Sequence, residues 1–308
     1  MTIIVYSDVI VPECVFTPAS GGSRTRQNSR TMNQGGFASA NVVRGVTLRT
    51  YSLSTIVMTL DNFQRIINLA EVTDYGAFGM LMKDPVDSQT TSADGVLQGY
   101  ISGVESGAIG YGNGGPLYGF RKLYAIASRA KTWPVTRPIS PVITRAGSPV
   151  SSGVSAGNIS ISAGPSYVTF VADASRSVSI VTVGATTQVT LASAIPGLGI
   201  GDLLWLDTLS GADAGLLNDK SHTITNITGV GLNVYTLSTN TAGKTITSGS
   251  GQGRKYPQPT EQLLWTGEYY TPVQFASDNL DWDLARPGDY EDRLIAGSSI
   301  SLIEVREA

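Results

Sequence analysis

One stretch of the chain has helical periodicity, and the sequence around it does not. In Thr59–Val72, TLDNFQRIINLAEV, apolar residues recur every three or four positions, which places them on one side of a helix. Thr59 is expected to cap the first turn, where Asp61 suits the helix dipole. A helix of this length is marginal by itself. We therefore expect its apolar side to cover a face of a sheet or to close the end of a β-sandwich. The apolar residues are Leu60, Phe63, Ile66, Ile67 and Ala70.

Most of the remaining sequence is typical of strands. It is rich in Val, Ile and Thr, and 35 glycines among 308 residues indicate many turns. Residues 3–11 are expected to form a first strand. Residues 42–57 are expected to form another, in which a bulge separates Leu48 from Tyr51 and Leu53. The predicted fold class is mainly β: a β-sandwich flanked by one helix.

Residues 177–256 have a pattern of their own. Short alternating strands follow one another, separated by Gly-rich turns, as in SVSIVTV, TQVTLA and HTITNIT. Regularly spaced short strands of this kind favour a small β-barrel. We therefore predict an inserted small barrel at 177–256, and one sandwich domain built from 1–176 and 257–308.

Composition excludes several classes of function. The net charge of -3 gives no strong attraction to nucleic acid or to an anionic membrane. No apolar run approaches the roughly 18 residues of a membrane span. Cys14 is the only cysteine in the sequence, so no internal disulfide can form.

Motifs for catalysis and for metal or cofactor binding are weak. His222 is the only histidine, and we expect it on the surface of a strand. A Cys14–His222 nucleophile pair has no supporting motif, and these two soft ligands cannot build a zinc site without carboxylates. The glycines of 110–115 fit G-x-G-x-x-G, but Pro116 and a strand follow instead of a helix. We interpret them as a flexible hairpin loop and predict no catalytic residue, metal or cofactor.

Two other functions stay open. Asp281 and Asp283 flank Trp282, and acid pairs beside an aromatic residue can hydrolyse glycosides. Aromatic residues of the barrel, Trp205 and Tyr235, could contact a host glycan, although a buried core position is the expected place for Trp205. A polysaccharide or cell-wall hydrolase and a glycan- or host-surface-binding module are the alternatives that follow.

Charge is distributed unevenly along the chain. The polar, Gly-rich segment 17–40 carries arginines and no acid, and 278–292 is strongly acidic. The basic segment is either a solvated loop or an arm that becomes ordered against a neighbouring subunit. Opposite charges on one chain can set which faces of two copies meet. The predicted subunit contact joins Arg24, Arg26, Arg30 and Arg44 to Asp281, Asp283, Asp289 and Glu291.

Three ordered stretches carry a family resemblance. NLAEVTDYGAFGMLMKDPVD, EYYTPVQFASDNLDWDL and SLIEVREA resemble, in order, gFLxxDPxD, FDVPVRFDTDxL and IPLIEVR. These are patterns of the distal tail proteins of phages and gene transfer agents. Here Tyr269-Tyr270 replaces Phe-Asp, Gln274 replaces the arginine, and Ser277-Asp278-Asn279-Leu280 replaces the last tetrad. The resemblance covers roughly 40–175 and 260–308.

A second resemblance concerns 195–255. Its blocks IPGLGIGDLLWL, AGLLNDKSHTITNITG and NVYTLS are similar to small β-barrel modules of phage tail proteins. Those modules are distant relatives of the first catalytic-cysteine half-domain of ubiquitin-activating enzymes. The segment has no cysteine, so that chemistry is not implied.

The family resemblance implies a structural role in the virion and no enzymatic activity. It implies a tail-tube-like β-sandwich that forms a homo-oligomeric ring, expected to be a hexamer. The ring would join the tail tube protein to the baseplate hub protein, and DNA would pass through its lumen without specific binding.

Overall fold

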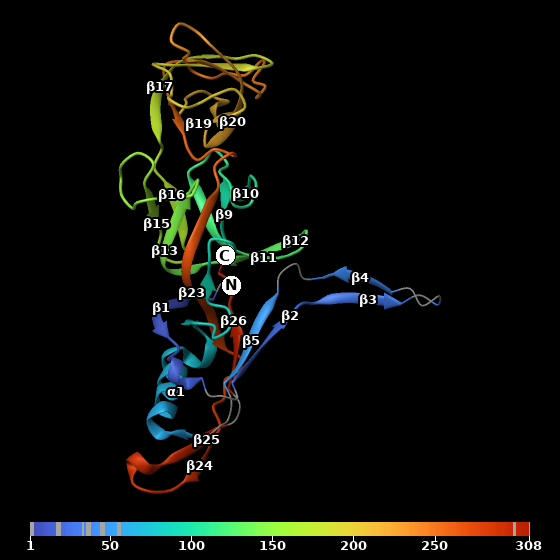
Figure 1. Cartoon of the computed structure of the whole chain (residues 1–308), viewed down its shortest axis with the longest axis vertical. Helices are drawn as coiled ribbons and strands as arrows, with labels where there is room; N and C mark the ends of the chain where they lie inside the picture. The colour runs from blue at the N-terminus through green and yellow to red at the C-terminus, as the bar shows by residue number, and fades with distance from the viewer. Residues whose placement is uncertain are drawn as a thin grey trace. The chain divides into compact units, whose positions relative to one another are not determined.

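The computed structural model describes residues 3–16, 20–32, 34, 38–43, 47–53, 57–297 and 300–307, with Glu291 and Gly297 described by backbone only. The chain forms two compact units. The first unit contains Met1–Ser88 and Tyr269–Ala308, and the second contains Gln89–Glu268. The fold is mainly β, as predicted, with one α-helix among the described residues and a closed small barrel (Figure 1).

The first unit contains a six-stranded sheet. Its strand order is β1-β7-β23-β26-β5-β2, in which only the β1–β7 pair is parallel. Two smaller sheets accompany it, the hairpin β3-β4 and the three-stranded β24-β25-β6. The bounds are β1 (Val5–Ile10), η1 (Glu13–Val15), β2 (Gly21–Thr25), β3 (Asn28–Met32), β4 (Ala38–Val42), β5 (Leu48–Leu53), β6 (Met58–Thr59), α1 (Leu60–Val72), η2 (Asp74–Gly76), β7 (Gly79–Met82), β24 (Trp282–Arg286), η4 (Tyr290–Asp292), β25 (Leu294–Gly297) and β26 (Ile300–Glu304), with Tyr269–Phe275 from β23 (Leu263–Phe275).

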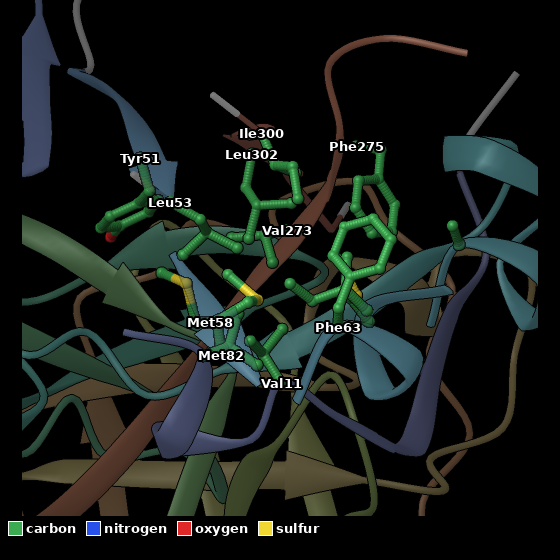
Figure 2. Close-up of a cluster of buried hydrophobic side chains, with 14 of the residues drawn as sticks. Val11, Tyr51, Leu53, Met58, Phe63, Met82, Val273, Phe275, Ile300 and Leu302 are labelled. Carbon is green, nitrogen blue, oxygen red and sulfur yellow. The ribbon is translucent and has the colours of Figure 1, made fainter. Parts of the chain in front are cut away.

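The predicted helix is confirmed. α1 begins at Leu60, after Thr59 in the N-cap position, although the Thr59 hydroxyl makes no capping hydrogen bond. Phe63, Ile66 and Ala70 are buried in one cluster with apolar residues of the six-stranded sheet. Figure 2 shows Phe63 of α1 in the same cluster as Val273 and Phe275 of β23. Burial of this stripe is what stabilises a helix too short to persist alone.

The predicted bulge in the strand at 42–57 is wrong where the structure describes that strand. β5 keeps an unbroken register with both β2 and β26. Arg49, Tyr51 and Leu53 face the interior in strict alternation, and Leu48 is only half-buried. The bulge was expected because Leu48 and Tyr51, three positions apart, lie on opposite faces of an unbroken strand. The strand is unbroken, and Arg49 is buried instead of Leu48.

The second unit contains a sheet and the barrel. Its sheet strands are β8 (Gln89–Thr90), β9 (Gly95–Ile101), β10 (Val104–Ser106), β11 (Leu117–Ile126), β12 (Arg129–Val135), β13 (Arg137–Arg145), β14 (Ser148–Pro149), β15 (Ile159–Ile161) and β16 (Tyr167–Phe170), with Leu263–Glu268 from β23. The barrel elements are β17 (Ala174–Thr182), β18 (Thr187–Leu191), β19 (Leu203–Asp207), η3 (Ala214–Leu216), β20 (Lys220–Thr228), β21 (Val234–Leu237) and β22 (Gln252–Lys255).

The barrel is closed and has its own core. The strand order β17-β18-β21-β20-β19-β22 returns to β17, so no strand edge stays open. Leu191, Leu204 and Leu237 are among its fully buried residues. The two ends of the insertion meet, since the Asp173 N–H donates to the Lys255 carbonyl at 2.9 Å. Arg145 fixes both ends: it makes hydrogen bonds to Asp173 at 2.6 Å and to Glu261 at 2.8 Å.

Candidate functional site

The first unit contains a cluster of buried charges centred on Arg49. This side chain is only 2% exposed. Its guanidinium lies 3.5 Å from the Asp84 carboxylate and donates to Asp87 at 3.0 Å and to the Thr271 hydroxyl at 3.2 Å. A buried guanidinium is tolerated only when it is paired and hydrogen-bonded in this way. Arg49 was not predicted from the sequence, because its place in the alternation before Tyr51 and Leu53 was the only signal for it.

The turn Asp84-Pro85-Val86-Asp87 holds both carboxylates in place. Asp84 Oδ1 accepts the backbone N–H groups of Val86 and Asp87 at 2.9 and 3.1 Å. Its Oδ2 accepts the Tyr51 hydroxyl at 2.8 Å, and Asp87 Oδ1 accepts the Tyr269 hydroxyl at 3.1 Å. The turn therefore positions two acids toward β5 through local hydrogen bonds.

Glu304 of β26 supplies a third carboxylate. Its Oε2 accepts the backbone N–H of Arg49 at 3.0 Å. Burial raises the pKa of Glu304 to about 7, and the guanidiniums of Arg49, Arg306 and Arg24 oppose that rise. Burial outweighs these three guanidiniums, so Glu304 takes up or releases its proton near neutral pH.

The three stretches that carry the family resemblance all reach this cluster. Asp84 and Asp87 come from the first stretch, Tyr269 and Thr271 from the second, and Glu304 from the third. Their polar residues bind the same arginine or its acids. A pocket of about 300 Å³ lies beside the cluster, lined by Phe16, Gly22, Arg24, Arg49, Tyr51 and Asp84 among others.

The structure separates the arginines of the predicted contact. Arg24 in β2 makes an ion pair with Asp87 of its own chain and keeps 43% of its side chain exposed. Arg26 is half-buried between β2 and β3, Arg30 is exposed in β3, and Arg44 lies outside the described residues. The segment 17–40 is not the solvated loop that was one of its two interpretations, because its described residues include β2, β3 and part of β4.

The predicted acidic residues lie in and beside the β24–β25 hairpin of the first unit. Asp281, Asp283 and Asp289 are exposed, and the Asp281 carboxylate accepts the side-chain amide of Asn279 at 2.9 Å. Glu291 belongs to η4, and its side chain lies outside the described part of the chain. The predicted contact between two copies of the chain stays a prediction.

The aromatic residue of the suggested acid pair lines an apolar pocket. Trp282 forms one wall of a pocket of about 300 Å³, together with Phe63 of α1 and Leu284 of β24. Neither Asp281 nor Asp283 lines this pocket. The arrangement suits binding of apolar groups better than acid-base chemistry on a sugar, which needs carboxylates on both sides of the substrate.

The prediction that His222 is a surface residue is wrong. The ring is 5% exposed inside the barrel wall, and burial lowers its pKa. Nδ1 contacts the Thr239 hydroxyl at 2.7 Å and Nε2 contacts the Leu217 carbonyl at 2.9 Å. With both nitrogens engaged, His222 serves the barrel fold rather than activating a nucleophile. Cys14, the other member of the suggested pair, is exposed in η1.

The barrel's aromatic residues are all buried. Trp205, Tyr235 and Tyr256 are at most 7% exposed, as was expected for a core position of Trp205, and residues 174–256 are all described. Sugar stacking needs an exposed aromatic face, and the barrel presents none. Among the residues that the structure describes, no group of three or more His, Cys, Asp or Glu is placed to hold a metal ion. No helix in this part of the chain is long and apolar enough to span a membrane.

The GYGNGG loop, residues 110–115, is not the flexible hairpin loop that its composition predicted. Gly112, Gly114 and Gly115 pack against the start of β19 and the end of the insertion. A Cβ at Gly114 would lie 2.5 Å from the Cβ of Leu203, and one at Gly115 would lie 2.9 Å from the Trp205 ring. These glycines allow close approach of the barrel to the sheet of the same unit.

The sequence matches no model of a known protein family, and no curated protein matches it.

Proposed function

We propose that this chain is a structural protein of a bacteriophage tail, a component of a distal tail or baseplate ring. The observation that carries the proposal is the six-stranded sheet of the first unit. Its terminal strands, β1 and β2, each pair on one side only within the described residues. The three stretches that resemble distal tail proteins meet in this same unit, around Arg49.

The backbone of Gly22 points to the outer side of β2. The Arg49 N–H donates to Glu304, which lies on the β26 side of β5. The backbone N–H of Arg49 therefore points away from Arg24, its partner in β2. Because antiparallel strands alternate, the N–H of Gly22 points to the outer edge of β2. All five residues of β2 are exposed, and the strand has neither proline nor bulge to block pairing.

Two different open edges favour a ring. Pairing β2 of one copy with β1 of the next is a heterologous contact, and such contacts close into a ring when the rotation between copies closes. Closure satisfies the edges that a monomer leaves exposed. In the proposed virion the ring, a hexamer by the family resemblance, joins the tail tube protein to the hub protein. The net charge of -3 is compatible with a lumen that DNA crosses without retention.

Substitution of Gly22 tests the edge contact. Gly22→Pro removes an outward N–H and adds a ring at the edge, and we expect it to weaken assembly at least about tenfold in concentration. Gly22→Ala is the matched control, because it adds a Cβ 3.3 Å from the Tyr51 ring but keeps the N–H. Light scattering after size exclusion measures the mass of each, and circular dichroism checks the fold. A monomeric wild-type chain, or equal assembly of both variants, would contradict the proposal.

A further inference from the structure

The β3–β4 hairpin has two chemically different faces. Residues directly opposite on paired strands lie on the same face, and Arg30 pairs with Ala40 while Met32 pairs with Ala38. One face therefore carries Asn28, Arg30, Met32, Ala38, Ala40 and Val42. The other carries Ser29, Thr31, Ser39 and Asn41. The hairpin is an amphipathic ribbon with a single arginine on its more apolar face.

The apolar face of the hairpin is uncovered in the single chain. All ten residues of β3 and β4 are exposed, Met32 by 74% and Val42 by 57%. Figure 1 shows the two strands continuing beyond β2 and β5 as a two-stranded ribbon. A hairpin that packs against nothing is marginal in water. A partner surface that covers Met32 and Val42 would therefore stabilise the hairpin.

A surface of matching chemistry lies elsewhere in the first unit. The pocket of about 300 Å³ between α1 and the β24–β25 hairpin is lined mainly by apolar side chains. Trp282 remains 56% exposed and Leu284 47% exposed at its mouth, although the Trp282 ring contacts Phe63 edge-on at 6.5 Å. Exposed apolar walls around a concave site indicate a binding surface.

The segment that forms the pocket wall is net acidic, whereas the hairpin is basic. Asp281, Asp283, Asp289 and Asp292 are exposed in this segment, against Arg286 and Arg293, and Arg293 lines the pocket itself. Residues 14–60, which contain the hairpin, include arginines but no acid. Arg24 and Arg49 of that stretch bind Asp87 internally, whereas Arg30 stands exposed on the apolar face. Charge complementarity of this kind sets which surfaces meet.

We propose that the β3–β4 hairpin of one copy binds the Trp282 pocket of a second copy, with Met32 and Val42 on the apolar wall and Arg30 toward the exposed acids of residues 281–292. The inference rests on the proposed function, because it names a contact within the assembly. Each copy carries one hairpin and one pocket, so the contact is heterologous and compatible with a closed ring. It reinforces the edge contact between β1 and β2.

Cysteine cross-linking between two pools of full-length chain tests the contact. Both pools carry Cys14→Ser, which removes the only native thiol. One pool has Met32→Cys and the other Leu284→Cys, each with a tag of different length. Both sites are exposed, by 74% and 47%, so the monomer fold should persist. After mixing and mild oxidation, we expect a disulfide between the pools at least about tenfold above background, because bound sites reach high effective concentrations.

The control replaces the Leu284→Cys pool by Val154→Cys, a position in the second unit that is 94% exposed. Cross-links from random collisions would appear equally in both mixtures. If wild type assembles but the Met32–Leu284 disulfide stays at the control level, this contact is refuted while the ring remains. If wild type is monomeric, the proposed function itself fails. A cysteine pool that folds but no longer assembles supports the contact, because both sites are exposed in the monomer.

Discussion

At the scale of single residues, Arg49 determines how the first unit is held together. Its charge is buried, and burying an unpaired guanidinium costs several kcal/mol. Asp84 and Asp87 offset that cost, and both are in turn fixed by backbone N–H groups or tyrosine hydroxyls. The cluster links β2, β5, β23 and β26 through side-chain contacts and the backbone N–H of Arg49. Its strength therefore depends on the protonation state of its third acid, Glu304.

Replacing Glu304 by Gln should remove a pH dependence of stability. The pKa of Glu304 is raised from 4.5 to about 7 in the fold, so the folded chain retains this proton at pH values where the unfolded chain has lost it. The contribution is fully present below about pH 4.5 and is lost as pH rises through about 7. At about pH 8.5, Glu304→Gln should be more stable than wild type by about 1–3 kcal/mol. Denaturant melts at about pH 5.5, 7 and 8.5 measure this difference.

The comparison with wild type at each pH isolates Glu304. His222 acts in the opposite direction, because its pKa is lowered by burial and its contribution is lost as pH falls below its ordinary value near 6.5. That contribution is identical in both proteins and cancels in the difference. If the free energies of unfolding of wild type and Glu304→Gln change in parallel with pH, ionisation of Glu304 does not destabilise the fold.

At the scale of elements, sequence patterns predicted a helix or strand correctly where burial of apolar residues alone determines the element. α1 was predictable because its apolar residues follow the helical period and dock on a sheet. β5 was predicted as a strand, but with a false bulge, because hydrophobicity cannot assign an arginine to the interior. Its partners Asp84, Asp87 and Glu304 lie far away in sequence. The hairpin β3–β4 has no buried residue, so periodicity gave no signal for it.

The GYGNGG loop illustrates the same limit for glycine. Composition predicts flexibility, but Gly114 lies at a φ of +70° with Leu203 directly against it. Gly114→Ala should destabilise the second unit by about 3 kcal/mol, since backbone strain and overpacking add. Gly103→Ala is the matched control: its φ is +77°, with nothing within 4 Å, so only about 1 kcal/mol of strain is expected.

Thermal or denaturant unfolding of the two glycine variants distinguishes packing from conformation. Both residues belong to the second unit and both have positive φ. A clearly larger loss for Gly114→Ala assigns the loop to the barrel contact. Equal losses would mean that Leu203 moves aside at no cost, and that the loop is held only by its backbone conformation.

At the scale of the whole molecule, the first unit is built from two segments that are far apart in sequence. The first unit is completed by Tyr269–Ala308, so β26 reaches its partner β5 only after the entire second unit has been made. Periodicity detects the strands but not such pairings, because it carries no information on distant partners. The inserted barrel was predictable because the sequence changes to short alternating strands and Gly-rich turns. The Arg49 cluster could be recognised only from the structure.

Excision of the barrel tests whether assembly belongs to the first unit. Replacing Ala174–Lys255 by a short glycine–serine linker is feasible because Asp173 and Lys255 are joined by a hydrogen bond of 2.9 Å. Arg145, Asp173 and Glu261 stay in the chain. Because β1, β2 and the β3–β4 hairpin all lie in the first unit, we expect the number of copies per particle to be unchanged, as measured by native mass spectrometry.

A second substitution makes the excision decisive. Adding Gly22→Pro to the shortened chain should weaken assembly as strongly as it does in the full chain, because the same β2 edge would be blocked in both. Assembly that disappears with the barrel, while circular dichroism shows an intact sheet, would instead assign the subunit contact to the second unit. Assembly of the shortened chain that ignores Gly22→Pro would point to association through the apolar surface left around Gly115 once Trp205 is removed.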